Sequence, residues 1–309
     1  MTLNELKYVL ALVREKHFGK AAASCGVAQP SLSVAVKKLE EELGVALFER
    51  RAQQVLPTAV GLSVAEEARK VFGHVERIRD VARQGLDPLA GPFRLGIIYT
   101  VCPYLVPSLI REVTKSAPSM PLVLEENFTE NLLEALRKNE IDAAIVALPV
   151  TTPGMMIAPL YEEEFIVAVP KDHPFAGQKK LSRADIATER LLLLSKGHCM
   201  RDQVLDFCPE SENASVGVVN GTTLFTIREM VAQGLGITLL PASSVPRAKA
   251  DADIAFGYFA APKPTRRIVL VWRQGFNRLE AIETLRGALS EVKLNGCRAL
   301  NLPVVSTVS

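Results

Sequence analysis

The chain has 309 residues, 48% of them hydrophobic, and a formal net charge of +2. This length predicts two or three domains, and the apolar content excludes a disordered chain. The net charge is too small to indicate a nucleic-acid partner, so any DNA contact must come from a local cluster of Lys and Arg. Residues 1–16 are interrupted by charges and the chain has five cysteines, which predicts a cytoplasmic protein without a membrane span or structural disulfides.

Residues 1–50 have the spacing of a helix-turn-helix. Ala22 is small enough for two helices to cross closely, and Gly26 supplies a turn residue that tolerates positive φ. Pro30 suits the first turn of the second helix, where a missing N–H costs nothing. A helix in the major groove presents its N-terminal end to base edges, so polar residues there are candidate DNA contacts; the alternative is an ordinary polar surface. The candidates on this helix are Gln29, Pro30, Ser31, Ser33 and Lys37.

Residues 43–57 predict a β-hairpin wing, in which Arg50 and Arg51 are candidate phosphate contacts. A long helix follows, with Thr58 as its N-cap. Its apolar residues repeat at alternating intervals of four and three, as in a coiled-coil seam. The seam consists of Val64, Ala68, Val71, Val75, Ile78 and Ala82. We interpret this helix as a dimerising linker that ends near residues 85–88; the alternative is a surface helix packed on its own domain.

After residue 91, short apolar segments that predict strands, among them the leucines at 191–194, alternate with helical segments. This alternation predicts parallel sheets with helices on both faces. Such a region predicts an α/β domain of two lobes, with a ligand site between them at the carboxyl ends of the strands. The final residues show no periodicity and predict a loose tail. The expected organisation is a winged helix-turn-helix at 1–58, a linker helix and hinge at 59–90, a regulatory domain at 91–295 and a tail at 296–309. Lobe I is expected at about 91–162 and 268–295, and lobe II at about 163–267.

One segment with two cysteines, GHCMRDQVLDFC, is the strongest candidate for chemistry. Cys199 is expected at the N-terminus of a helix, where the helix dipole, His198 and Arg201 favour a thiolate. Asp202 is placed to orient one of these two side chains through a hydrogen bond. A thiolate attacks peroxide, and Cys208 is a candidate partner for the resulting sulfenic acid. The alternative is that both cysteines only pack in a core, as free cysteines often do.

Three segments of the sequence resemble the LysR-type transcriptional regulators. They are FGKAAASCGVAQPSLSVAVKKLEEELGVALFER, LPTAVG and MVAQGLGITLLP. The likeness extends over residues 1–295 and implies two periplasmic-binding-protein-like lobes behind an all-α winged helix-turn-helix and a long linker helix. It also implies double-stranded operator DNA as a partner, RNA polymerase as a further candidate partner, and a homo-oligomer built as a dimer of dimers. Ala28 departs from the Ser or Thr that is usual in the family, and losing this cap costs the helix about 1 kcal/mol.

The segment with two cysteines resembles the redox loop of the peroxide-sensing OxyR branch of this family. This resemblance implies hydrogen peroxide as the signal, Cys199 as the peroxidatic residue and Cys208 as its resolving partner. Thr100 and Thr129 match hydroxyl positions that line the peroxide pocket, although either residue alone suggests only a local cap or turn. We expect His198, Arg201 and Asp202 to line the same pocket. No role follows for the other three cysteines, Cys25, Cys102 and Cys297.

The same pairing predicts a conformational switch. If a helix separates Cys199 from Cys208, their Cα atoms lie about 13 Å apart at 1.5 Å per residue. A disulfide tolerates about 7 Å at most. We therefore expect disulfide formation to unwind the intervening segment, and this rearrangement to be the signal.

Two other functions remain as alternatives. One is a LysR-type regulator that binds a small metabolite between its lobes, and the other is a thiol peroxidase or a related redox enzyme. An enzyme needs neither a helix-turn-helix nor a linker, so we predict that the protein is not an enzyme. No metal or cofactor is expected, because the sequence has no P-loop, no GxGxxG after a strand, and four histidines without zinc-site spacing.

Overall fold

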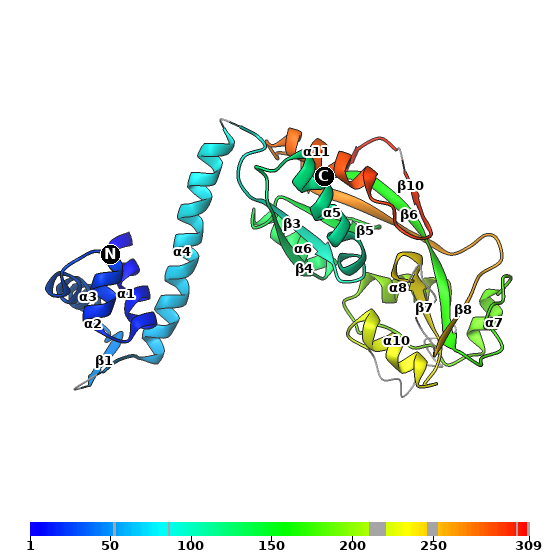
Figure 1. Cartoon of the computed structure of the whole chain (residues 1–309), viewed down its shortest axis with the longest axis horizontal. Coiled ribbons are helices and arrows are strands. Elements are labelled where there is room, and N and C mark those ends of the chain that lie inside the picture. The colour runs from blue at the N-terminus through cyan, green and yellow to red at the C-terminus, as the bar shows by residue number, and fades with distance from the viewer. Residues whose placement is uncertain (52–53, 86, 210–220, 246–252, 301, 308–309) are drawn as a thin grey trace. The chain divides into compact units, whose positions relative to one another are not determined.

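The computed structural model describes the chain except residues 52–53, 86, 210–220, 246–252, 301 and 308–309 (Figure 1). The chain divides into two compact units, Met1–Gly85 and Leu86–Ser309. The first unit contains the helix-turn-helix and the long helix, and the second contains the α/β lobes.

Three helices build the core of the first unit: α1 (Leu3–Glu15), α2 (Phe18–Cys25) and α3 (Gln29–Leu43). Gly26 ends α2 with φ of 72°, a left-handed conformation that a side chain disfavours, and the chain can therefore turn into α3. Ala22 is buried in the same apolar cluster as the inner face of α3, so its small side chain allows the two helices to approach closely.

A hairpin and a long helix complete this unit. Strands β1 (Phe48–Arg51) and β2 (Gln54–Pro57) pair antiparallel, which is the wing expected from the sequence. Helix α4 (Ala59–Gln84) follows, and Thr58 Oγ1 caps it by accepting a hydrogen bond from the Gly61 N–H at 2.9 Å.

The apolar seam of α4 lies in two different environments. Ala68 is buried in the core of its own unit, and Val64 packs against the same core. Farther along the helix, Val71 is 38% exposed and Ile78 is 70% exposed. The first half of the seam therefore packs on its own domain, whereas the second half leaves apolar side chains uncovered.

The longest strand of the second unit, β6 (Met155–Pro170), runs through both lobes (Figure 1). Its first half pairs antiparallel with β9 (Thr265–Arg273) in the first sheet. From Phe165 onward it pairs with β7 (Thr238–Pro241) and β8 (Ile254–Gly257) in the second sheet. Among the described residues the first sheet has the strand order β10-β6-β9-β5-β3-β4. The other strands of this order are β3 (Phe93–Ile98), β4 (Leu122–Asn127), β5 (Ala143–Ala147) and β10 (Cys297–Ala299). Strand β11 (Val305–Ser306) also pairs with β6.

Each lobe has its own apolar core. In the first lobe the strands pack against α5 (Cys102–Ser116), α6 (Thr129–Arg137) and α11 (Leu279–Glu291). In the second lobe they pack against α8 (Cys199–Phe207) and α10 (Leu224–Ala232). The short elements of the second lobe are α7 (Arg183–Ala187) and the 3-10 turn η1 (Ala242–Ser244).

The α/β class of the second unit is confirmed, but three expectations about it were wrong. The first sheet is mixed: β3 pairs parallel with β4 and β5, whereas β9 pairs antiparallel with β5 and β6. Continuous apolar strands indicate burial on both faces and do not specify strand direction. The leucines at 191–194 form isolated bridges instead of a strand. The expected loose tail contains β10 and β11, both paired with β6, and these strands are too short to produce a recognisable pattern.

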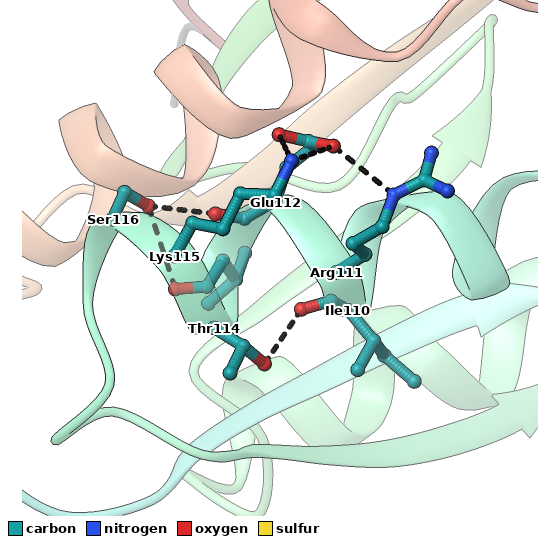
Figure 2. Close-up of polar contacts among 7 residues, drawn as sticks. Ile110, Arg111, Glu112, Thr114, Lys115 and Ser116 are labelled. Carbon is teal, nitrogen blue, oxygen red and sulfur yellow. Dashed lines mark hydrogen bonds and ion pairs between the residues drawn. The ribbon is translucent and has the colours of Figure 1, made fainter.

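The outer side of α5 carries ion pairs and an exposed isoleucine (Figure 2). The Glu112 carboxylate accepts hydrogen bonds from Lys115 Nζ at 3.0 and 3.1 Å and from Arg111 Nε at 3.3 Å. Ile110 is exposed on this helix, and Val123 is exposed on the edge strand β4.

Two glycines of α4 provide a matched test of the packing of the first unit. A Cβ at Gly61 would clash with the Leu47 carbonyl oxygen, whereas a Cβ at Gly73 would meet nothing within 4 Å. We predict that Gly61→Ala lowers the free energy of unfolding by about 1–3 kcal/mol, because backbone must move. Gly73→Ala should raise it by up to about 1 kcal/mol, because alanine favours a helix interior. Calorimetric unfolding of the two variants checks this pair, and equal effects of the two substitutions would contradict it.

Candidate functional site

The start of α8 is fixed by a glycine. Gly197 has φ of 99°, which L side chains rarely adopt, and a Cβ there would lie 3.4 Å from the Phe128 ring. The chain then enters α8 with His198 at the N-cap and Cys199 as the first helical residue. Cys199 therefore lies at the positive end of the helix dipole, as the sequence predicts.

Cys199 borders a small cavity between the two lobes. The cavity has a volume of about 10 Å³, and Thr100, Thr129 and His198 also line it. Thr100 follows β3 and Thr129 follows β4. Because these two strands are parallel neighbours, both threonines lie at the same edge of the sheet. The Thr129 hydroxyl is buried and finds no hydrogen-bond partner among the described protein atoms. A volume of roughly 10–15 Å³ is what one water-sized molecule needs, so the cavity suits a very small polar molecule.

His198 is part of an aromatic cluster over this cavity. Its ring packs edge-on against Phe128 at 4.8 Å and Tyr99 at 5.7 Å between ring centroids. His198 Nε2 lies 3.0 Å from the Thr222 carbonyl oxygen. Because a carbonyl only accepts, Nε2 carries the proton and Nδ1 keeps its lone pair. Burial lowers the pKa of His198, although the bond to Thr222 opposes this. His198 is therefore neutral at pH 7 and does not supply the positive charge expected from the sequence.

Arg201 and Asp202 do not line the cavity, contrary to our expectation. Arg201 Nη1 donates to the Leu194 carbonyl oxygen at 3.1 Å within the second lobe, and Asp202 is exposed. Arg201 is two residues after Cys199, a rotation of about 200° around the helix, so its side chain points away from Cys199. Sequence proximity to Cys199 was misleading for this reason.

Arg266, a buried cation beside the site, was not predicted from the sequence. Arg266 Nη1 donates to Thr100 Oγ1 at 2.8 Å, and Nη2 donates to Glu163 Oε1 at 3.1 Å. Both charged side chains are 0% exposed. Burial lowers the pKa of Arg266, but Glu163 and then Cys199 outweigh this, so its pKa is raised. In the sequence, the only sign of this buried ion pair is two adjacent arginines at the start of an apolar strand. Three glutamates lie opposite them on the paired strand, and this register cannot be read from the sequence.

The two cysteines of the segment belong to different cores. Cys199 packs against the first-lobe core, whereas Cys208 is fully buried in the second-lobe core with Met200 and Val204. Neither cysteine is in a disulfide. The nine-residue helix α8 separates them, which corresponds to Cα atoms about 13 Å apart.

The other cysteines have different surroundings. Burial raises the pKa of Cys102 to about 11, with a further contribution from Glu126. Burial also raises the pKa of Cys297, as does Glu163. Both are protonated thiols at pH 7 and therefore poor nucleophiles. Cys25 packs against the core of the first unit.

The outer face of α3 presents the candidate DNA contacts. Leu32, Val36 and Leu39 point into the core, and most of the predicted contact residues are on the opposite side. Gln29, Pro30, Ser31 and Lys37 are exposed, and Ser33 is partly exposed. Ala28 occupies the N-cap without a side-chain hydrogen bond, so the cap is missing as its sequence suggests. Arg50 and Arg51 are on β1, but their side chains are outside the described part of the structure.

Within the described ranges, no helix is long and apolar enough to cross a membrane. No group of three or more His, Cys, Asp and Glu is arranged to hold a metal ion among these residues.

Comparison with known proteins identifies both units. Residues 3–62 match the bacterial regulatory helix-turn-helix of the lysR family, and residues 87–293 match the LysR substrate binding domain. A hydrogen peroxide-inducible genes activator from Pectobacterium carotovorum subsp. carotovorum is 40% identical over 89% of this chain and 91% of its own. A full-length OxyR mutant from Pseudomonas aeruginosa is similar in structure, with a TM-score of 0.61, 43% identity and coverage of 94% and 99%. A hydrogen-peroxide-bound OxyR mutant from Corynebacterium glutamicum has a TM-score of 0.65, 36% identity and coverage of 94% and 91%.

The lowered pKa of His198 predicts a pH-dependent stability. Because the folded state holds the neutral ring, its contribution is complete above about pH 6.5 and is lost as the pH falls from there toward the lowered pKa. We predict that the stability advantage of the wild type over His198→Gln shrinks between pH 7.5 and pH 5.5. Urea unfolding followed by the fluorescence of the single tryptophan, Trp272, reports on the second unit. A difference between the two proteins that is constant across this range would refute the assignment.

Proposed function

The chain belongs to the LysR family of bacterial transcription regulators, and we propose that it is an OxyR-type regulator that senses hydrogen peroxide through Cys199. The observation that carries this proposal is the small cavity bordered by Cys199, Thr100, Thr129 and His198. Its volume suits a molecule of the size of peroxide, and its lining offers hydroxyl groups beside a thiol and a buried cation.

In the first step the Cys199 thiolate attacks one oxygen of hydrogen peroxide. An S–O bond forms as the O–O bond breaks, so the sulfur is oxidised to a sulfenic acid and the leaving hydroxide takes a proton to become water. Arg266 already donates to Thr100 Oγ1, so the hydroxyl proton of Thr100 is available for another acceptor. The Thr129 hydroxyl supplies a second donor. The guanidinium of Arg266 favours the negative charge on the thiolate and on the departing oxygen.

In the second step the Cys208 thiol attacks the sulfenic sulfur of Cys199, which forms a disulfide and releases water. The separate cores of the two thiols support the view that α8 must unwind and Cys208 must leave its core before the bond can form. The oxidised protein then keeps a backbone conformation that the reduced protein disfavours.

The first unit is the proposed DNA-binding unit. Gln29, Ser31 and Ser33 contact base edges of double-stranded operator DNA, and Lys37 reaches a phosphate or a base. Arg50 and Arg51 on the wing are proposed phosphate contacts, a role that rests on the sequence alone. The protein acts on DNA in the cytoplasm, and RNA polymerase is its proposed partner in transcription.

The exposed apolar side chains support a homo-oligomer, which we propose to be a dimer of dimers. Val71 and Ile78 on α4 supply one uncovered seam, and the exposed Ile110 on α5 and Val123 on β4 are candidates for a second apolar surface. Two distinct self-association surfaces are what a dimer of dimers requires.

The alternative functions have less support. An ordinary metabolite is too large for the cavity of about 10 Å³ at Cys199. A larger cavity of about 340 Å³ lies elsewhere in the second unit, against α11 and β10, and includes neither of the two switch cysteines. The helix-turn-helix and the relatives, which are transcription regulators, argue against a redox enzyme.

A thiol map after one equivalent of hydrogen peroxide tests the proposal. We predict a Cys199–Cys208 disulfide in the wild type and no such bond in Cys199→Ser. Cys208→Ser should accumulate a sulfenic acid at Cys199, detected by dimedone labelling and mass spectrometry. Cys297→Ser is the control and should behave as the wild type, because the raised pKa of Cys297 keeps it protonated. Oxidation of Cys102 or Cys297 as fast as Cys199 would rule the proposal out.

A further inference from the structure

We propose that Gln203 is a positioning residue that holds α8 against the first lobe while the thiols are reduced, and thereby sets how readily the disulfide forms. This inference rests on the proposed redox function, because it concerns the equilibrium between the dithiol and the disulfide. Gln203 lies between the two cysteines, four residues after Cys199 and five before Cys208.

Helix α8 has one face for each lobe. Residues four apart lie on the same face of a helix, so Cys199 and Gln203 share one face, and Met200 and Val204 share another. The Met200–Val204 face is buried in the second-lobe core, together with Cys208 at the end of the helix. Cys199 packs against the first-lobe core. The helix is therefore held between the lobes, with Gln203 on the side that meets the first lobe.

A hydrogen bond from Gln203 crosses between the lobes. Its Nε2 donates to the Leu148 carbonyl oxygen at 3.0 Å. Leu148 directly follows β5, and its side chain packs on the first-lobe core, so the acceptor is on a rigid part of that lobe. The amide orientation is fixed, because only the NH2 group can face a carbonyl oxygen.

The amide oxygen of Gln203 is buried and has no hydrogen-bond partner among the described protein atoms. A side chain that leaves a buried acceptor unpaired incurs a desolvation cost. The hydrogen bond to Leu148 stabilises the docked helix, and the unpaired oxygen opposes this. The docked state is consequently held only weakly at this position, as a switch requires.

Disulfide formation must break this contact. The bond cannot form while α8 is helical, and unwinding residues 199–208 moves Gln203 away from Leu148. The strength of the Gln203–Leu148 contact therefore contributes to the equilibrium constant for disulfide formation. A change that weakens only the docked state must shift that equilibrium toward the disulfide.

Replacing the Gln203 amide by a carboxylate turns its hydrogen bond to the Leu148 carbonyl oxygen into a repulsive contact. In Gln203→Glu the ionised side chain has no proton to donate and faces the Leu148 carbonyl, so the reduced state is destabilised. When the carboxyl is protonated at lower pH, it donates again and restores the contact. A purely structural defect would not be repaired by acid in this way. Gln233→Glu, an exposed position at the end of α10, is the matched control for the added charge.

The full-length protein is equilibrated with glutathione buffers, in which protein dithiol and oxidised glutathione give protein disulfide and two reduced glutathiones. For Gln203→Glu at pH 8.5 we predict an equilibrium constant at least about 10-fold above that of the wild type at the same pH, because an unpaired buried charge costs more than a neutral group. The excess should shrink toward the wild-type value at pH 5.5. Gln233→Glu should match the wild type throughout.

A second variant tests the same role in case Gln203→Glu has a folding defect. The side chain in Gln203→Asn is one methylene too short to reach Leu148, and we predict an increase of about 5-fold, as expected for one lost hydrogen bond. Constants equal to the wild type for both variants at every pH would overturn the role of Gln203. If the wild type itself forms no Cys199–Cys208 disulfide with oxidised glutathione, the proposed function fails instead.

Discussion

Arg266 on β9 and Glu163 on β6 face each other, both fully buried, close to the point where β6 passes from the first sheet into the second. Removing either partner would leave an unpaired buried charge, at a cost of about 3–5 kcal/mol. Arg266 also holds Thr100 beside the Cys199 cavity. Glu163 also accepts hydrogen bonds from the Ser243 hydroxyl of the second lobe at 3.1 and 3.2 Å. This ion pair thus links Thr100, which lines the Cys199 cavity, to Ser243 of the second lobe.

Helix α8 converts this arrangement into a switch. Its two long faces contact different cores, so the reduced state is stabilised by contacts that the disulfide must disrupt. Cys208 lies in an apolar core, where its thiol is protected from peroxide until the helix opens. The two sulfurs are therefore kept apart by packing, and in the proposed mechanism the oxidation of Cys199 changes the contact between the lobes.

Local sequence patterns predicted the parts of the protein that depend on neighbouring residues. The turn at Gly26, the cap at Thr58 and the helix that begins at Cys199 each follow from residues close together in the chain. The convergence of Thr100 and Thr129 was inferred from the family resemblance and from the rule that parallel strand ends meet at one sheet edge.

Features that depend on strand pairing or on helix rotation were not predictable in the same way. Arg266 becomes the partner of Glu163 only once the register of two strands more than one hundred positions apart is known. Arg201 lies close to Cys199 in sequence, yet the helix directs its guanidinium to Leu194. The tail residues pair with β6 although their own pattern is too short to indicate a strand.

Hydrogen exchange of the α8 amides tests the central claim most directly. Full-length protein is compared in the reduced state and after stoichiometric peroxide, with α11 as an internal reference. If the disulfide requires α8 to unwind, the amides of residues 200–207 should lose their protection on oxidation while those of α11 keep it. A protein that contains the Cys199–Cys208 disulfide and shows unchanged protection in α8 would contradict the account.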